Sequence, residues 1–214
     1  VDPGGTLANR PQNTLRAIFL PWYPQTAAPA ARRVEALDCL RRRNPDVAWD
    51  LMVGLLPQGN DVQHPTARPR YRTWAPGEKP RVTEAEYWTF VSAIVSRLLE
   101  DAGRSGPRWA QVIEAVPNLS PQLRRKVVER LREIAAPSTS EKDRASIWHA
   151  LRRLVSRHRS YRDAEWALPD TDIDELANLM APFQPLDPRD RFGWLFGHRP
   201  ELPQRLSASW DARR

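Results

Sequence analysis

Apolar residues recur at intervals of three and four along most of this chain, the spacing that places them on one face of an α-helix. No segment alternates between apolar and polar residues over a useful length, so we predict an all-α fold. We interpret residues 1–12 as an extended lead-in or linker and residues 200–214 as a C-terminal tail. The predicted helices span residues 30–43, 46–56, 84–102, 109–116, 120–136, 141–161, 172–181 and 189–197.

The predicted helix starts carry residues that cap helices. Thr83 and Glu86 have the spacing of a capping box, in which each side chain bonds the other residue's backbone N–H. Other predicted starts have a side chain suited to the N-cap, in three cases directly before proline: Asn44, Ser120, Ser140, Asp170 and Asp187.

The predicted helices form four consecutive hairpins, and one sequence pattern occurs twice. Residues 49–57 and 109–117 both begin with tryptophan and end with proline, with apolar residues at matching positions. A single hairpin cannot bury its apolar stripe alone, so neighbouring hairpins are expected to stack. We therefore predict one domain over 13–199, an irregular α-solenoid of the HEAT-like kind, with a globular helical bundle as the alternative.

A long loop at 58–83 interrupts the helical pattern, because its prolines and glycines exclude a regular helix. Its extended, arginine-rich part has two interpretations. It is either a segment that binds an anionic ligand or a partner's edge, or a strap that lays its aromatic rings over helix ends. The candidate binding residues there are Arg68, Arg70, Tyr71, Arg72 and Trp74.

Charge is unevenly distributed along the 214 residues, which hold 33 Lys and Arg against 26 Asp and Glu. Residues 120–160 hold eleven basic and four acidic side chains, whereas 163–190 hold eight acidic and one basic. The basic segment is a candidate face for phosphates or an acidic protein, unless the acidic segment lies against it and neutralises it. The candidate residues of this basic face are Arg124, Arg125, Arg152, Arg153 and Arg157.

Motifs for catalysis and metal binding are not found, so we expect no cofactor, no metal ion and no enzymatic activity. The single cysteine, Cys39, permits no internal disulfide, and no apolar run is long enough to span a membrane. The acidic start of 170–174 resembles a calcium loop, but Glu175 and Ala181 stand where that loop needs Gly and Glu. An unrecognised enzyme built around His149 or His158 with a carboxylate is a remaining alternative.

Five stretches of the sequence together resemble a known class of protein. They lie at 15–26, 49–57, 64–66, 69–74 and 194–196. They resemble the helical, non-catalytic region of very large bacterial multidomain proteins, among them STAND-type and other conflict-system (antiphage defence) proteins. The resemblance implies a helical sensor array whose effector, and often an NTPase, lie elsewhere in the parent protein; it implies no active-site residue here.

These observations favour a non-catalytic helical scaffold or sensor module in the bacterial cytoplasm. We expect it to recognise a protein partner or other domains of its parent chain. The alternative is a nucleic-acid-binding module that uses the basic 120–160 face, for which affinity falls steeply with salt. No membrane interaction is expected.

Overall fold

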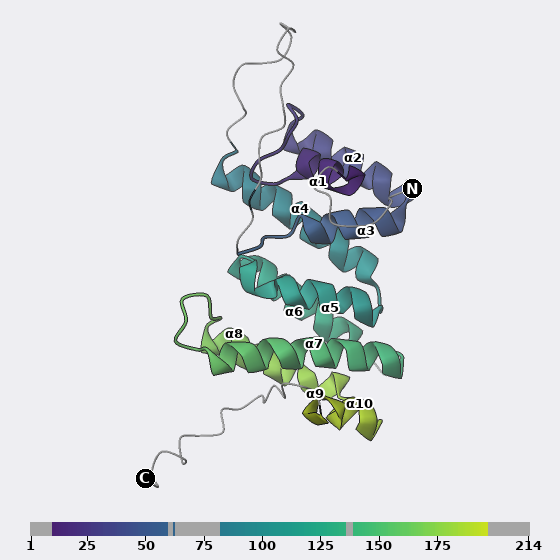
Figure 1. Ribbon diagram of the computed structural model, residues 1–214, viewed down its shortest axis with the longest axis vertical. Coiled ribbons are helices and arrows are strands. Elements are labelled where there is room, and N and C mark those ends of the chain that lie inside the picture. Colours follow the sequence, from purple (N-terminus) through teal and green to yellow (C-terminus); the bar gives the residue numbers. More distant parts are fainter. Residues whose placement is uncertain (1–9, 60–61, 63–81, 136–138, 197–214) are drawn as a thin grey trace, which may run out of the picture. The chain divides into compact units, whose positions relative to one another are not determined.

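The computed structural model describes residues 10–59, 62, 82–135 and 139–196. This part of the chain contains helices and no strand, so the all-α class is confirmed (Figure 1). The α-helices are α1 (Pro11–Phe19), α2 (Ala30–Arg43), α3 (Pro45–Gly54), α4 (Glu84–Ala102), α5 (Gly106–Ala115), α6 (Pro121–Ile134), α7 (Glu141–Ser160), α8 (Asp170–Asn178), α9 (Met180–Phe183) and α10 (Pro188–Phe192). Two 3-10 helices complete the set, η1 (Val116–Asn118) and η2 (Gly193–Phe196).

Most of the predicted caps are confirmed. The Glu86 N–H donates to Thr83 Oγ1 at 3.2 Å and the Thr83 N–H donates to Glu86 Oε2 at 2.9 Å, which completes the capping box of α4. Ser120 and Ser140 accept from backbone N–H groups of α6 and α7. Asp187 accepts from the Arg189 N–H at 2.8 Å at the start of α10.

Two residues predicted as helix caps make no capping hydrogen bond as an N-cap side chain. Asn44 is the N-cap residue of α3, but its side chain makes no cap hydrogen bond. The N-cap of α8 is Pro169, and Asp170 is the first residue inside the helix, where an acidic side chain interacts favourably with the helix dipole.

The helix boundaries differ from the pattern at both ends of the described chain. Helix α1 was not predicted; it begins at Pro11, inside the stretch interpreted as a lead-in, and proline suits the first helical turn. The predicted helix 172–181 is split into α8 and α9, and 189–197 into α10 and η2. Helix boundaries are hardest to predict from the sequence where a segment is short and its apolar periodicity is weak.

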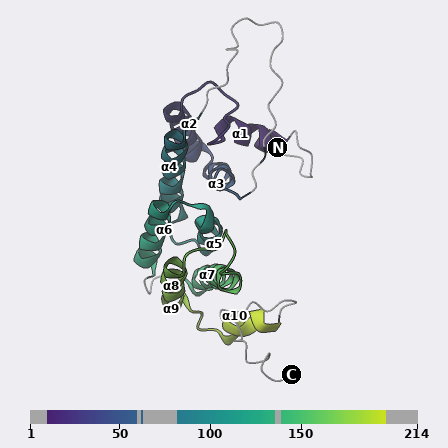
Figure 2. The ribbon, with the colours of Figure 1, turned by 90° about the vertical axis from the view of Figure 1, so that its left-hand side faces the viewer.

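The chain divides into two compact units, Val1–Asp101 and Ala102–Arg214, which are described separately. In the first unit, α3 packs against α1 and α2. Helices α2 and α4 lie side by side in Figure 2 and are joined by ion pairs. Arg97 Nε and Nη2 both contact the Asp38 carboxylate at 2.6 Å, and Arg41 contacts Asp38 and Asp101 at 3.0 and 2.7 Å.

A buried arginine also holds the first unit together. Arg33 of α2 is 5% exposed, and its Nη1 donates to the carbonyls of Phe19 and Leu20 at 3.2 and 2.9 Å. Its guanidinium lies 4.3 Å from the centre of the Phe90 ring of α4. Burial lowers the pKa of Arg33 from its usual value, and the α1 carbonyls compensate because they carry the negative end of that helix dipole.

In the second unit, α5 and α7 make the most extensive helix contact. Their starts approach closely at Gly106, whose N–H donates to Asp143 Oδ1 at 2.7 Å. The Trp109 indole is completely buried and donates to the Gly103 carbonyl at 3.0 Å. Helix α7 also packs on α8 and α9, so it is the central element of this unit.

Helix pairing in this unit departs from the predicted hairpin of 120–136 with 141–161, because α7 packs along α5 rather than along α6. Within the unit, Figure 2 shows α5 and α7 in one layer and α6 and α8 in the other. Both tryptophans of the duplicated pattern, Trp49 and Trp109, are buried. The contacts of the described residues do not by themselves show a regular repeat, and the single domain over 13–199 stays a prediction.

Candidate functional site

The candidate residues of the 58–83 loop lie outside the described residues, so their role stays a prediction. This applies to Arg68, Arg70, Tyr71, Arg72 and Trp74. The candidate residues of the basic 120–160 segment are all described, on helices α6 and α7 of the second unit.

Arg152 is buried rather than displayed. Its side chain is on the core side of α7 with only 5% of its surface exposed, and its guanidinium lies 4.1 Å from the centre of the Trp194 ring. This cation–π contact is one of the links that hold η2 to the unit. The sequence carried a signal for this burial, because Trp148, Arg152 and Val155 share a helical stripe.

Of the other basic candidates, Arg124 is half-buried and the remaining three are exposed, and Arg124 and Arg153 are paired with acidic side chains. Arg153 is exposed and contacts Glu114 of α5 at 3.0 Å. Basic side chains of 120–162 meet acidic ones of 163–190 in four ion pairs: Arg124–Asp172, Arg132–Glu175, Arg159–Asp174 and Arg162–Asp170. The acidic segment therefore lies against the basic one and neutralises part of its charge. Each exposed pair contributes only about 0–1 kcal/mol to stability.

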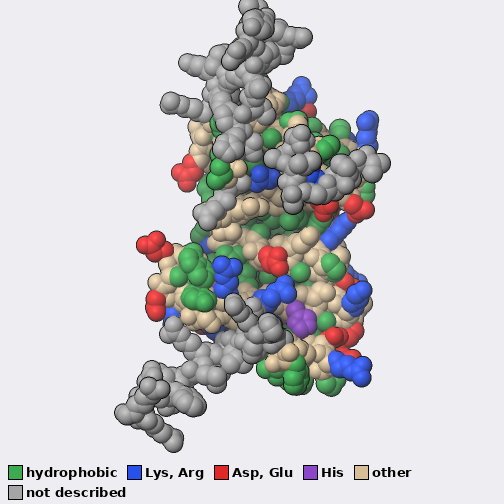
Figure 3. Space-filling model, viewed as in Figure 1, with side chains coloured by type: hydrophobic (Ala, Val, Ile, Leu, Met, Phe, Trp, Pro, Cys, Tyr) green, Lys and Arg blue, Asp and Glu red, His purple; other side chains and the backbone are tan. Residues whose placement is uncertain are grey.

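An aromatic cluster, formed by Arg157, Tyr161 and Trp166, lies where α7 ends and the following loop begins. Tyr161 and Trp166 are 60% and 48% exposed, and their ring centres are 5.7 Å apart. The Arg157 guanidinium lies 4.9 Å from the centre of the Trp166 ring. Figure 3 shows apolar side chains beside Lys or Arg side chains on this part of the surface.

His158 packs against Trp166 of the aromatic cluster from the core side. It is 2% exposed, its ring meets Trp166 edge to face at 5.3 Å, and its Nδ1 accepts a hydrogen bond from the Leu168 N–H at 3.0 Å. Burial, together with the neighbouring charge of Arg157, lowers the pKa of His158. The imidazole is therefore neutral at pH 7, which its role as an acceptor at Nδ1 requires.

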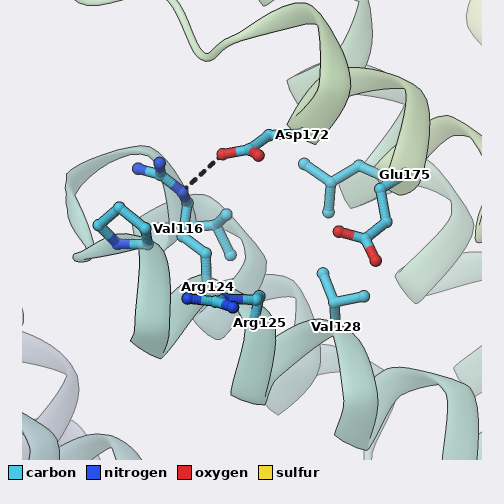
Figure 4. A pocket seen from close by; sticks show the side chains of 8 residues that line it. Val116, Arg124, Arg125, Val128, Asp172 and Glu175 are labelled. Carbon is cyan, nitrogen blue, oxygen red and sulfur yellow. Dashed lines mark ion pairs between the residues drawn. The ribbon is translucent and has the colours of Figure 1, made fainter.

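A pocket of about 280 Å³ lies between α6 and α8 (Figure 4). Its lining combines apolar with charged side chains: Val116, Pro121, Arg124, Arg125, Val128, Asp172, Glu175 and Leu176. Arg124 Nε lies 2.9 Å from Asp172 Oδ2, and this ion pair bridges the two helices. The contact is electrostatic, since the same N–H makes no well-aligned hydrogen bond; Arg124 Nη1 donates instead to the Leu119 carbonyl at 3.0 Å.

Both carboxylates of the pocket have a cationic partner, but one of its cations has no partner. Glu175 Oε1 accepts from Arg132 Nη2 at 2.6 Å, and Asp172 is paired with Arg124. Arg125 is exposed and makes no ion pair with any residue that the structure describes. The pocket therefore presents one uncompensated positive charge beside an apolar floor.

Of the two histidines considered for catalysis, His149 lies near Asp190, which acts on its pKa through its charge and a backbone hydrogen bond, and an enzymatic role stays an untested alternative. His158 is enclosed in the core of its unit, and neither His158 nor His149 lines the α6–α8 pocket. Burial, and next the charges of Arg152 and Arg153, lower the pKa of His149. Among the described residues, no group of three His, Cys, Asp or Glu side chains is arranged to bind a metal ion.

Comparison with known proteins does not assign the chain to a family. No protein-family model matches the chain, and no curated protein or solved structure is significantly similar to it. A membrane-spanning segment is not found in the described part either, because every helix there is too short or too polar to bridge a bilayer.

Sequence reasoning missed Trp166 and the pocket. Trp166 stands in a polar loop without periodic neighbours, so only its position close to Tyr161 hinted at a role. The pocket joins residues about fifty positions apart, and its apolar members belong to ordinary helical stripes.

Proposed function

We propose that this chain is a non-catalytic helical recognition module that binds a protein partner through the aromatic cluster of Arg157, Tyr161 and Trp166. The observation that carries the proposal is that two large aromatic rings remain half exposed although the loop beside them is held at Leu168 by a buried hydrogen bond to His158. Trp, Tyr and Arg are the residues most enriched among those that dominate binding energy at protein interfaces.

The cluster is preorganised, which favours binding. Trp166 contacts His158, Tyr161 and Arg157, so its ring loses little rotational freedom when a partner covers it. The loop that carries Trp166 is fixed at Leu168 by the hydrogen bond to His158. A partner therefore meets an apolar surface with one cation at its edge.

As part of the same proposal, the helices belong to an α-solenoid of stacked hairpins in a larger bacterial protein. The two-layered order of α5 to α8 supports this architecture within the second unit. The proposed setting is the cytoplasm, in a sensor region of the STAND or conflict-system type. The free and exposed Cys39 agrees with a reducing compartment.

A peptide-display selection tests the proposal. The full chain is used to select binders from a random peptide library, and their affinities are measured for the wild type, Trp166→Ala and Trp22→Ala. Trp22 is an exposed tryptophan of the first unit and serves as the matched control. We expect Trp166→Ala to weaken binding about thirtyfold or more, as for a residue at the centre of an interface, and Trp22→Ala to leave it unchanged. Peptides that bind Trp166→Ala as tightly as the wild type would overturn the proposal.

A second candidate function is binding of single-stranded nucleic acid, which the same exposed rings favour. Bases stack on aromatic side chains, and a neighbouring arginine contacts the backbone phosphates. The ion pairs with the acidic segment count against this candidate, because they cancel part of the positive field that such binding needs. Labelled oligonucleotides that bind the wild type but not Trp166→Ala, with affinity falling linearly in log salt, would establish this candidate instead.

A further inference from the structure

We propose that the α6–α8 pocket is a second binding site, which takes a carboxylate attached to a short aliphatic group. This inference does not depend on the aromatic cluster, because the pocket is formed by other residues and its test uses small probes. The argument rests on the charge balance of the pocket, its apolar floor and its size.

The charges that line the pocket favour an anionic ligand. Asp172 and Glu175 are each neutralised by an arginine, at 2.9 and 2.6 Å, whereas Arg125 has no ionic partner among the described residues. A carboxylate is the matching ligand group because the guanidinium can donate two parallel hydrogen bonds to it.

The apolar residues of the pocket favour an aliphatic group in the remainder of the ligand. Val116 of η1 and Val128 of α6 line the pocket in Figure 4, and Leu176 of α8 also belongs to its lining. An aliphatic group that covers them loses its contact with water, which is favourable roughly in proportion to the apolar area buried. The volume of about 280 Å³ is at the lower limit for small-molecule sites, so it accommodates a group of the size of one amino-acid residue.

The paired charges keep the pocket open and give it specificity. The Arg124–Asp172 pair holds α6 and α8 at a fixed separation, and Arg124 is anchored a second time at the Leu119 carbonyl. Glu175 lies on the opposite helix from Arg125 and already occupies Arg132, so this side of the pocket offers no free cation to a second negative charge on the ligand. Monocarboxylates are therefore preferred over dicarboxylates.

Titration of the full chain with three small probes, followed by the backbone amide signals of α6 and α8 in NMR spectra, tests the inference. The probes are 4-methylpentanoate, N-acetyl-leucine and the uncharged 4-methylpentanamide. We expect saturable shifts with dissociation constants of about 1 mM for the acids and at least tenfold weaker binding of the amide. Tighter binding of N-acetyl-leucine identifies a peptide C-terminus as the source of the ligand, and tighter binding of 4-methylpentanoate identifies a free acid.

Four variants complete the test. Arg125→Ala is expected to weaken binding of the acids at least tenfold, whereas Lys126→Ala, an equal loss of charge on the next residue outside the pocket lining, leaves it within about twofold. Arg125→Lys is expected to bind with intermediate affinity, and Glu175→Gln to strengthen binding about threefold because the charge of Arg132 is then no longer compensated. Equal binding of acid and amide, no saturable shift up to about 20 mM acid, or unchanged binding to Arg125→Ala would each overturn the inference.

Discussion

Replacing Gly106 with alanine tests whether the contact between α5 and α7 organises the second unit. A Cβ atom at residue 106 would lie 2.5 Å from the Asp143 carbonyl oxygen, 2.6 Å from the Asp143 Cα and 2.8 Å from the Ser146 Cβ. Two of these three atoms belong to the α7 backbone, so no rotation of a side chain relieves the clash. The start of α5 must move away from α7 by about 1 Å to restore ordinary contact distances.

The cost of this movement has two parts. Forcing extra volume into a packed contact typically costs about 1–3 kcal/mol. The hydrogen bond from the Gly106 N–H to the charged Asp143, now 2.7 Å, lengthens at a cost of about 1–2 kcal/mol. Alanine restricts the unfolded chain more than glycine does, which offsets about 0.5–1 kcal/mol. The net expectation is a loss of about 2–4 kcal/mol in the free energy of unfolding of the second unit.

Urea unfolding and hydrogen exchange measured by mass spectrometry provide the test. We expect Gly106→Ala to lower the unfolding midpoint and to speed exchange in α5 and α7, with α2 and α3 unaffected. Gly193→Ala is the matched control, because a Cβ at residue 193 meets no atom within 4 Å. A loss below about 0.5 kcal/mol, comparable to that of a surface substitution, would refute the packing argument.

Three further predictions concern charge and backbone. The Arg97 guanidinium lowers the pKa of the Asp38 carboxyl to about 2, so its contribution is fully present above about pH 4 and is lost as pH falls through 2. Asp38→Asn should therefore cost about 1–2 kcal/mol at pH 7 and clearly less at pH 2 in urea unfolding. Gly54→Ala should stabilise the first unit by about 0.5–1 kcal/mol in thermal unfolding, because its Cβ would lie at an ordinary 3.8 Å from Arg16. The lowered pKa of His158 makes stability fall as pH drops below about 6.5, and urea unfolding from pH 7.5 to 5 should show a smaller slope for His158→Gln. An unchanged slope would contradict neutral burial of this histidine.

The candidate site was only partly predictable. The clustering of arginine in 120–160 correctly pointed to a region with unusual charge, and Arg125 and Arg157 remain exposed there. Which of these arginines reach the surface depended on the neighbours of each helix face. Arg152 is covered by Trp194, as its place on the apolar stripe of α7 indicated, whereas no feature of the sequence showed that Arg124 pairs with Asp172.

Local features were determined by the sequence alone. A helix cap joins residues two or three positions apart, so Thr83 with Glu86, Ser120, Ser140 and Asp187 could be identified without knowledge of the fold. The apolar periodicity likewise determined the all-α class, since a spacing of three and four suits no strand.

Only the tertiary structure decided which helices pack together. An apolar stripe shows that one face of a helix must pack against another element. It does not show which element, because the apolar stripe of any other helix of similar width can cover that face. The absence of a side chain at Gly106 allows α5 to approach α7 closely, and this contact takes the place of the predicted packing of α6 against α7. Burial of Arg33 and Arg152, exposure of Trp166 and the α6–α8 pocket all follow from such pairings, because they depend on residues far apart in the chain.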